Sequence, residues 1–243
     1  MGDKNLNDLL RWSIENTASG PDGTTSEAPR STLNPEALAA LMGGPSDADL
    51  MRESMAHIVS SDPEITLESR LTAFDNLEQL IESLDNANLL SKLGLWTPLL
   101  ACLAHDEDEI RLMAAWCVGT AVQNNEPSQE RLVALGGVEK LVQMAVGKRL
   151  PPVPTAANGE ETGAKANGAG TEEEETQKVR RKAVYALSSA VRNYQPAMDV
   201  CAAELRRQGQ DEHVGDEGKT IDATDMDAVD VVINGLKEKV NGT

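Results

Sequence analysis

Residues 109–127 read EIRLMAAWCVGTAVQNNEP, and residues 178–196 read KVRRKAVYALSSAVRNYQP. The two stretches align without a gap, and identical or similar side chains recur along both. The matched pairs include Ile110 with Val179, Arg111 with Arg180, Trp116 with Tyr185, Asn124 with Asn193 and Pro127 with Pro196. A helix that occurs twice in a chain predicts a stack of helical repeats, an architecture that mostly binds other macromolecules.

The repeat extends beyond this helix, because Leu135-Gly136 lies 42 residues after Leu93-Gly94. The predicted unit is a short helix, a glycine, a second helix, a polar turn and the long helix, with the period of armadillo-type repeats. The long helices are 69 residues apart, so one unit carries 27 additional residues before its long helix. This acidic, low-complexity insertion at about 148–177 is predicted to be disordered.

Apolar residues at three- and four-residue steps predict a further helix over 67–84. It is a weaker third copy, and the sequence leaves its register against the other two open. We expect the DNAN stretch at 85–88 to end this helix, and a short helix to follow over 89–93. The pattern fades after Pro196, until an amphipathic helix over 226–240 that is expected to cap the open end of the stack.

Four segments are expected along the chain. Residues 1–32 form a flexible N-terminal segment with a short amphipathic helix and a linker rich in Gly, Pro, Ser and Thr. Residues 33–62 hold N-terminal helices, 63–203 the armadillo-like repeats, and 204–243 a polar linker with the capping helix. The predicted fold class is therefore all-α, an armadillo-like helical solenoid with a disordered N-terminal linker and the acidic insertion.

The composition indicates the cellular compartment and the class of partner. The formal net charge of −18 argues against a nucleic-acid partner, because the sequence shows no basic stripe that would release counterions from phosphates. Cys102, Cys117 and Cys201 are odd in number and lack metal-binding spacing, which indicates a reducing compartment. No apolar run reaches the length of a membrane span, and the N-terminus is unlike a secretory signal. We expect a cytoplasmic monomer that binds neither membranes nor nucleic acid.

The sequence offers no constellation for catalysis. His57, His105 and His213 are far apart and lack the spacing of metal ligands. The acidic runs at 106–109 and 172–175 are more simply read as solvated turns than as acid/base pairs. The glycine pairs follow no strand and lack a P-loop lysine, so they are helix stops. We predict a protein that is not an enzyme and that carries no metal and no cofactor.

The long helices of an armadillo stack line a concave groove, so their outward side chains are candidates for partner binding. Positions i, i+4 and i+7 share one face, which gathers an aromatic ring, a small hydroxyl group and a long polar side chain in each copy. The candidate groove residues are Trp116, Thr120, Gln123 and Asn124 in the first copy, and Tyr185, Ser189 and Arg192 in the second. With an aromatic fraction of 2%, the core is an equal alternative for Trp116 and Tyr185.

Several stretches together resemble one protein family. They are AAWCVGTAVQNN (114–125), RRKAVYALSSAVRN (180–193), SLDNANLLSKLGLW (83–96), LLRWSIENT (9–17) and NPEALAALMGGPSDADLM (34–51). These stretches resemble the armadillo-type nucleotide exchange factors of the 70-kDa heat-shock chaperone. The resemblance covers roughly residues 5–16 and 33–200, with two departures from the family pattern: the insertion, and the loss of repeat signal after Pro196.

The resemblance implies a co-chaperone for protein folding and quality control that performs no chemistry of its own. Its concave face would hold one lobe of the chaperone's ATPase domain, open the nucleotide cleft, release ADP and let the client leave. Its N-terminal segment would mimic a client at the chaperone's peptide site. That role would fall to Leu9, Leu10, Trp12 and Ile14, and the alternative is a helix that docks on the solenoid.

Two other functions use the same architecture. A transport adaptor of the importin type carries Trp and Asn ladders over many repeats, whereas this chain has about three repeats and holds Thr120 and Ser189 where the Asn would stand. A purely structural scaffold would bind its partner without changing the partner's chemistry. Only an exchange assay separates such a scaffold from an exchange factor.

Overall fold

The computed structural model describes residues 44–152, 174–215, 218 and 220–242. Contacts within the chain divide it into two units, Met1–Ser46 and Asp47–Thr243. Of the first unit only residues 44–46 are described, so the architecture is that of the second unit. The helices predicted within residues 1–43 lie outside the described residues, as does most of the insertion.

The described part of the second unit is all-helical, as the repeat pattern predicted. The α-helices are α3 (Asp47–Ile58), α4 (Leu67–Ile81), α5 (Leu84–Lys92), α6 (Trp96–Ala101), α7 (Asp108–Val122), α8 (Glu126–Ala134), α9 (Gly137–Ala145), α10 (Gln177–Val191), α11 (Gln195–Arg207) and α12 (Met226–Asn241). Short 3-10 helices at Cys102–Ala104 and Asp211–His213 accompany them. No single described helix is long and apolar enough to span a membrane, although the bent pair Leu84–Lys92 and Trp96–Ala104 meets that test by length and composition.

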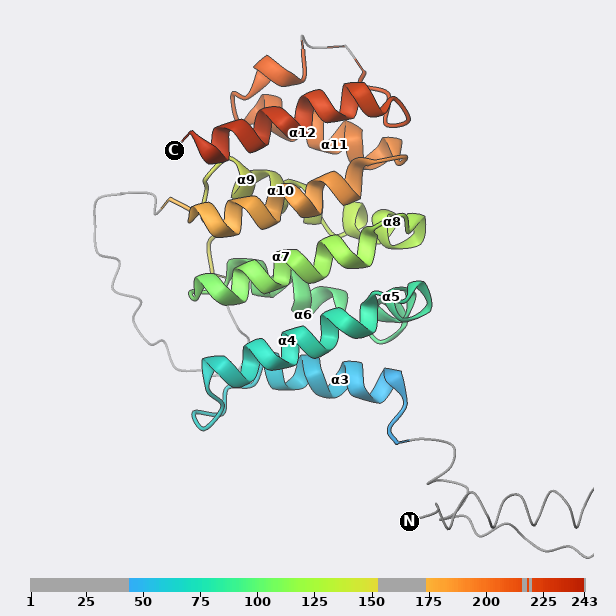
Figure 1. The fold of residues 1–243 in the computed structure, drawn as a ribbon, viewed down its shortest axis with the longest axis vertical. Helices are drawn as coiled ribbons and strands as arrows, with labels where there is room; N and C mark the ends of the chain where they lie inside the picture. The colour runs from blue at the N-terminus through green and yellow to red at the C-terminus, as the bar shows by residue number, and fades with distance from the viewer. Residues whose placement is uncertain (1–43, 153–173, 216–217, 219, 243) are drawn as a thin grey trace, which may run out of the picture. The chain divides into compact units, whose positions relative to one another are not determined.

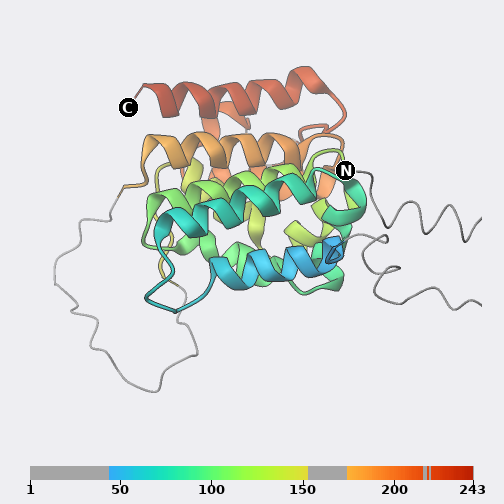
Figure 2. The same ribbon diagram turned by 60° about the horizontal axis from the view of Figure 1, so that its bottom comes forward.

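The long helices lie side by side in one layer, in the order α4, α7, α10 and α12 (Figure 1). Shorter helices, among them α6, α9 and α11, form a second layer behind them, and the view turned by 60° shows the same order (Figure 2). The chain passes through α5, α6 and α7, and then through α8, α9 and α10, as two successive three-helix units. This stack is an armadillo-like solenoid, and it confirms the predicted architecture.

Buried side chains settle the register of the weaker copy, because α4, α7 and α10 are each 15 residues long and bury the same positions. The equivalent sets are Ala73, Phe74, Leu77 and Ile81 in α4, Ala114, Ala115, Val118 and Val122 in α7, and Ala183, Val184, Leu187 and Val191 in α10. Phe74 therefore stands at the position of Ala115, and Asp75 stands at the position of Trp116. The core uses Phe74, and the Trp116 position faces outward.

The expected break at residues 85–88 is wrong, since α5 begins at Leu84 and runs through the DNAN stretch. The chain turns instead at Ser83, which has an extended backbone conformation. Asn86 is buried, and its amide nitrogen donates to the carbonyl of Leu80 at 3.0 Å and to the carboxylate of Asp47 at 2.8 Å. The Asn86 side chain thus satisfies a free carbonyl at the end of α4, a task that short polar side chains often perform next to helix ends.

The repeat pattern continues past Pro196, contrary to the expectation from sequence. Helix α11 follows α10 as α8 follows α7, and it runs to Arg207, across the predicted segment boundary between residues 203 and 204. Helix α12 packs against α10 and buries Val232, Ile233, Leu236 and Val240 in the spacing of the other long helices. It is therefore a fourth copy of the long helix as well as the end of the stack. Small apolar residues and a charged linker conceal this copy in the sequence.

The flanks of the insertion belong to the folded structure, which corrects the predicted disorder over 148–177. Lys148 and Glu174 form an antiparallel bridge, and the Glu175 amide donates to the carbonyl of Gly147 at 2.8 Å. The carboxylate of Glu175 is fully buried and accepts two hydrogen bonds of 2.8 Å from the guanidinium of Arg111. Only residues 153–173 of the insertion lie outside the described residues.

Candidate functional site

An open hollow of about 600 Å³ lies on the layer of long helices, across α4, α7 and α10. Five of the seven candidate groove residues line it together with acidic and apolar neighbours. The lining is Glu78, Glu82, Leu84, Trp116, Thr120, Gln123, Asn124 and Tyr185. The structure therefore brings the aromatic pair together on the surface and places neither ring in the interior: Tyr185 is 36% exposed, and Trp116 packs one side against the core.

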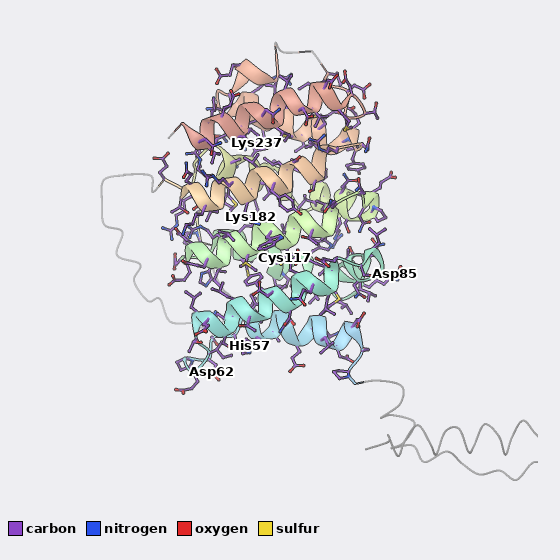
Figure 3. The ribbon with its side chains drawn as sticks, in the orientation of Figure 1. His57, Asp62, Asp85, Cys117, Lys182 and Lys237 are labelled. Carbon is purple, nitrogen blue, oxygen red and sulfur yellow. The ribbon has the colours of Figure 1, made fainter. Side chains whose placement is uncertain are left out.

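Lys182 joins the two aromatic rings. Its ammonium nitrogen lies 3.4 Å from the centroid of the Trp116 ring and 5.5 Å from that of Tyr185. Both distances are within the range of a cation–π interaction, which is worth roughly 0.5–1 kcal/mol at an exposed site. Figure 3 shows Lys182 at the junction of α10 and α7, so the cation spans the seam between two repeats.

The acidic side of the hollow comes from α4. The hydroxyl of Thr120 donates to a carboxylate oxygen of Glu78 at 2.8 Å, which holds this carboxylate over α7. Burial against the rings lowers the pKa of the Lys182 ammonium, and the nearby Glu78 carboxylate opposes that shift. Glu78, Thr120, Trp116 and Lys182 thus form one connected polar and aromatic surface that involves three successive long helices.

Gly119 explains how the Tyr185 ring can lie so close to α7. A Cβ atom at position 119 would stand 2.5 Å from Cε1 of Tyr185 and 3.1 Å from Cα of Ala186. Real Cβ atoms do not approach other atoms so closely, so a side chain at Gly119 would push the ring away. The glycine costs helix propensity in the middle of α7, and in return the aromatic ring rests on the backbone of the neighbouring repeat.

Asn124 lines the hollow, but the backbone conformation explains why an Asn stands at the equivalent position, 193, of the next repeat. Both residues follow the end of a long helix and have positive φ angles, 50° and 57° respectively. Asn is among the few residues other than glycine that adopt this left-handed conformation readily. The match between these two residues therefore reflects how each long helix ends, whatever Asn124 contacts in a complex.

Ser189 and Arg192 do not line the hollow. The carbonyl oxygens of Ser189, Ala190 and Arg192 accept hydrogen bonds from the side-chain amide of the buried Gln129, which satisfies the end of α10. The guanidinium of Arg192 pairs with the carboxylate of Asp230 on α12. Arg192 therefore ties α10 to α12, and its predicted role in partner binding stays a prediction.

The long-helix layer also corrects the expectation that the chain has no basic stripe. Helix α10 carries Lys178, Arg181 and Lys182 on its outward side and has no acidic residue. Three consecutive basic residues at 180–182 were visible in the sequence, but the net charge of the whole chain masked them. The lining residues that the sequence did not predict are Glu78, Glu82 and Leu84, and it also did not predict Lys182, which contacts the two aromatic rings. The usable signal for Lys182 was its position one turn before Tyr185.

A second hollow of about 730 Å³ lies between α3 and α4, where His57 hydrogen-bonds to Ser69. Among the described residues, no ion pair joins His57 to a carboxylate, and the hydroxyl of Ser69 is the group that its ring contacts. The same part of the chain holds no cluster of three metal-binding side chains. The predicted client-mimic residues, Leu9, Leu10, Trp12 and Ile14, lie outside the described residues.

Comparisons with known proteins identify the relatives of this solenoid. The sequence profile of the family described as "Nucleotide exchange factor Fes1" matches residues 6–90. The Hsp70 nucleotide exchange factor FES1 of Gibberella zeae is 53% identical, over 99% of both chains. The corresponding proteins of Neurospora crassa and Coccidioides immitis are 48% and 44% identical, over 98% and 97% of this chain and 98% of each relative. The chain belongs to the Fes1 family of nucleotide exchange factors.

Proposed function

We propose that this protein is a co-chaperone that binds the ATPase domain of an Hsp70 chaperone and accelerates the release of ADP. The observation that carries the proposal is the hollow across α4, α7 and α10, where the exposed Tyr185 and the partly buried Trp116 lie beside fixed polar groups. Exposed aromatic residues with a rigid support are typical anchors of protein interfaces. The relatives are named Hsp70 nucleotide exchange factors, which supports Hsp70 as the partner that we assign to this surface.

The mechanism needs binding energy and no covalent chemistry. An exchange factor that binds the open form of the ATPase domain more tightly than the closed form shifts the population toward the open form, from which ADP leaves. Thermodynamic linkage is reciprocal, so ADP weakens the binding of the exchange protein to the ATPase domain by the same ratio as the exchange protein weakens the binding of ADP. A rigid stack of repeats suits this task, because the long helices hold their outward side chains in fixed relative positions. In this mechanism the protein is not an enzyme and needs no cofactor.

Stopped-flow release of a fluorescent ADP analogue from Hsp70 tests the proposal directly. The wild-type protein should accelerate release many-fold, and Trp116→Ala should remove most of this acceleration, because truncating a buried interface anchor costs about 2 kcal/mol or more in binding. Val59→Ala is the control, since Val59 is an exposed apolar residue outside the hollow. A folded wild-type protein that leaves ADP release unchanged would contradict the proposal and favour the scaffold or the transport adaptor.

We extend the proposal to the N-terminal segment, whose Leu9, Leu10, Trp12 and Ile14 form an apolar run next to a linker. Such a run can occupy the chaperone's peptide site while the solenoid holds the ATPase domain, since the covalent link between them makes the second contact intramolecular. Deletion of residues 1–32 should then spare ADP release and slow client release. Equal rates of client release with and without the segment would favour a docked helix.

We also propose that the protein acts as a cytoplasmic monomer. Cys102, Cys117 and Cys201 are free and buried, which fits a reducing compartment. Burial raises the pKa of the thiols of Cys102 and Cys201 to about 12, so they are protonated and unreactive at neutral pH. Light scattering after gel filtration should give the mass of a single chain, 26.0 kDa, and a tagged copy should stay outside secretory compartments.

A further inference from the structure

The long helices that flank the hollow carry opposite charges on their outward sides. Helix α4 presents Glu68, Asp75 and Glu78, whereas the outward charges of α10 are the cations Lys178, Arg181 and Lys182. Trp116 of α7 lies between the two helices. The surface therefore has an acidic edge, an aromatic centre and a basic edge, although the whole chain has a formal net charge of −18.

The basic edge works against the stability of its own helix. Lys178 and Arg181 stand near the N-terminus of α10, where the helix dipole is positive and cations are unfavourable. The equivalent turn of α7 holds Asp108 and Glu109, and that of α4 holds Glu68. The charges at the start of α10 are thus opposite in sign to those at the start of α4 and α7, and this placement destabilises α10.

The three outward cations of α10 lie outside the ion pairs of the described residues, although the Glu78 carboxylate is near Lys182. Among the residues that the structure describes, Lys178 and Lys182 form no ion pair, and Arg181 donates only to the amide oxygen of Asn241 at 3.0 Å. The Trp116 ring holds the Lys182 ammonium in place, so its position is set before any partner arrives. Two exposed cations beside a third that is held in place are suited to meet carboxylates of another protein.

We propose that the basic stripe of α10 (Lys178, Arg181 and Lys182) receives an acidic element of the partner protein's surface, while the acidic edge of α4 excludes that element, so that the two edges set the orientation of docking. The inference rests on the proposed function and specifies the chemistry of the partner at that same site. Complementary charges steer encounter and suppress wrong orientations, because like charges that meet across an interface cost several kcal/mol.

A protein fits this surface better than a polyanion does. A nucleic acid or an anionic membrane presents negative charge over its whole length, and would place it against Glu68, Asp75 and Glu78 as well as against α10. The stripe is also short, since its three cations lie within residues 178–182. A folded protein can present carboxylates to α10 and avoid them opposite α4, and such a divided surface matches the observed pattern.

The test compares two doubly reversed variants of the full-length protein that change the net charge equally. Lys178→Glu/Arg181→Glu reverses the stripe, and Lys92→Glu/Arg131→Glu reverses exposed cations of α5 and α8, outside the long-helix layer. Association with the Hsp70 ATPase domain is measured by stopped flow at about 50 and 200 mM salt. We expect the stripe variant to associate roughly tenfold more slowly at low salt and to lose most of the salt dependence. The control variant should stay within about twofold of the wild type.

Thermal unfolding separates a binding defect from a folding defect. Because the stripe opposes the dipole of α10, the stripe variant should unfold at a temperature no lower than the wild type. If it does not fold, Lys178→Gln/Arg181→Gln takes its place, and association should then slow by about threefold or more.

Each outcome decides between the inference and its alternatives. Equal association rates and salt dependence for the stripe and control variants would overturn the inference and leave the proposed function standing. A folded wild-type protein that fails to bind the ATPase domain would overturn the proposed function, and this inference with it. Binding of a single-stranded oligonucleotide or of phosphatidylserine vesicles by the wild type, lost in the stripe variant, would assign the stripe to a polyanion and overturn the inference alone.

Discussion

The ammonium nitrogen of Lys182 lies 3.4 Å from the centre of the Trp116 ring, which links α10 to α7 on the surface of the solenoid. This contact predicts a measurable energetic coupling. In a double-mutant cycle with Lys182→Met and Trp116→Leu, the two residues should couple by about 0.5–1 kcal/mol in urea unfolding. Lys182→Arg serves as the control, because it keeps the cation over the ring. A coupling energy of zero would show that the contact does not persist in solution.

Gly119→Ala should disturb the hollow with little effect on overall stability. The added methyl carbon would stand 2.5 Å from Cε1 of Tyr185 and displace that ring, while alanine gains about 1 kcal/mol of helix propensity over glycine. We expect an unfolding temperature close to that of the wild type and a slower ADP exchange. Repeating the substitution in a Tyr185→Ala background removes the clash. A Gly119→Ala effect that is equally large in that background would refute the explanation.

Arg192 serves the α10–α12 junction through Asp230, so reversing it affects more than partner binding. Trp116→Ala combined with Arg192→Glu should abolish exchange with helicity intact, but Arg192→Glu also brings two carboxylates together at the junction. The exchanged pair Arg192→Asp/Asp230→Arg should recover the unfolding temperature of the wild type and should not recover exchange. Recovery of both properties would limit Arg192 to a structural role. Circular dichroism and the ADP-release assay supply the two readouts.

Glu175→Gln should destabilise the protein strongly, because it removes the buried counterion of Arg111 and leaves the guanidinium only the partly exposed carboxylate of Asp108. Arg111 is 1% exposed and Glu175 fully buried, and breaking such a pair typically costs about 3–5 kcal/mol. At roughly 2–4 °C per kcal/mol for a chain of this size, the unfolding temperature should fall by about 6 °C or more. Glu174→Gln is the matched control, since the Glu174 side chain is 72% exposed. This substitution should shift the unfolding temperature by about 2 °C at most. Equal shifts for the two neighbours would be incompatible with a buried ion pair in solution.

Glu204 should contribute a pH-dependent part of the stability. Burial raises the pKa of its carboxyl group, but hydrogen bonds from Arg207, Gln208 and Gln143 outweigh burial, so the pKa is lowered. A carboxyl group whose pKa is lower in the folded state stabilises the protein above its unfolded pKa of about 4.3. That contribution is lost as the pH falls through the lower, folded value.

Glu204→Gln should therefore reduce the free energy of unfolding at pH 7 by about 1–3 kcal/mol and flatten its decline below pH 5. Urea titrations at pH 7, 5 and 3 measure both effects. Asp199→Asn, on the exposed side of the same helix, controls for the change of charge. Parallel pH profiles for the wild type and Glu204→Gln would show that another group governs acid unfolding.

The sequence predicted those parts of the fold that depend on local periodicity. The duplicated long helix was visible because each copy repeats the same apolar spacing and ends at the same Asn, whose left-handed conformation only a few residues adopt. The DNAN stretch was misread because the propensity of Asn for turns is local, whereas the partners of Asn86 are the carbonyl of Leu80 and the side chain of Asp47. The C-terminal copy was missed because its charged linker interrupts the period.

By itself, the sequence determined the helical repeats, the order of their helices and five of the residues that line the hollow, because periodicity of side chains along one helix places them on one face. Only the tertiary structure decided which neighbours meet on that face. Lys182 reaches Trp116 from another repeat, Gly119 makes room for Tyr185, and Glu175 finds Arg111 across 64 positions of the chain. Such contacts depend on how helices that are distant in the sequence pack against each other, and on which charged side chains this packing buries together. The periodicity of one segment encodes neither.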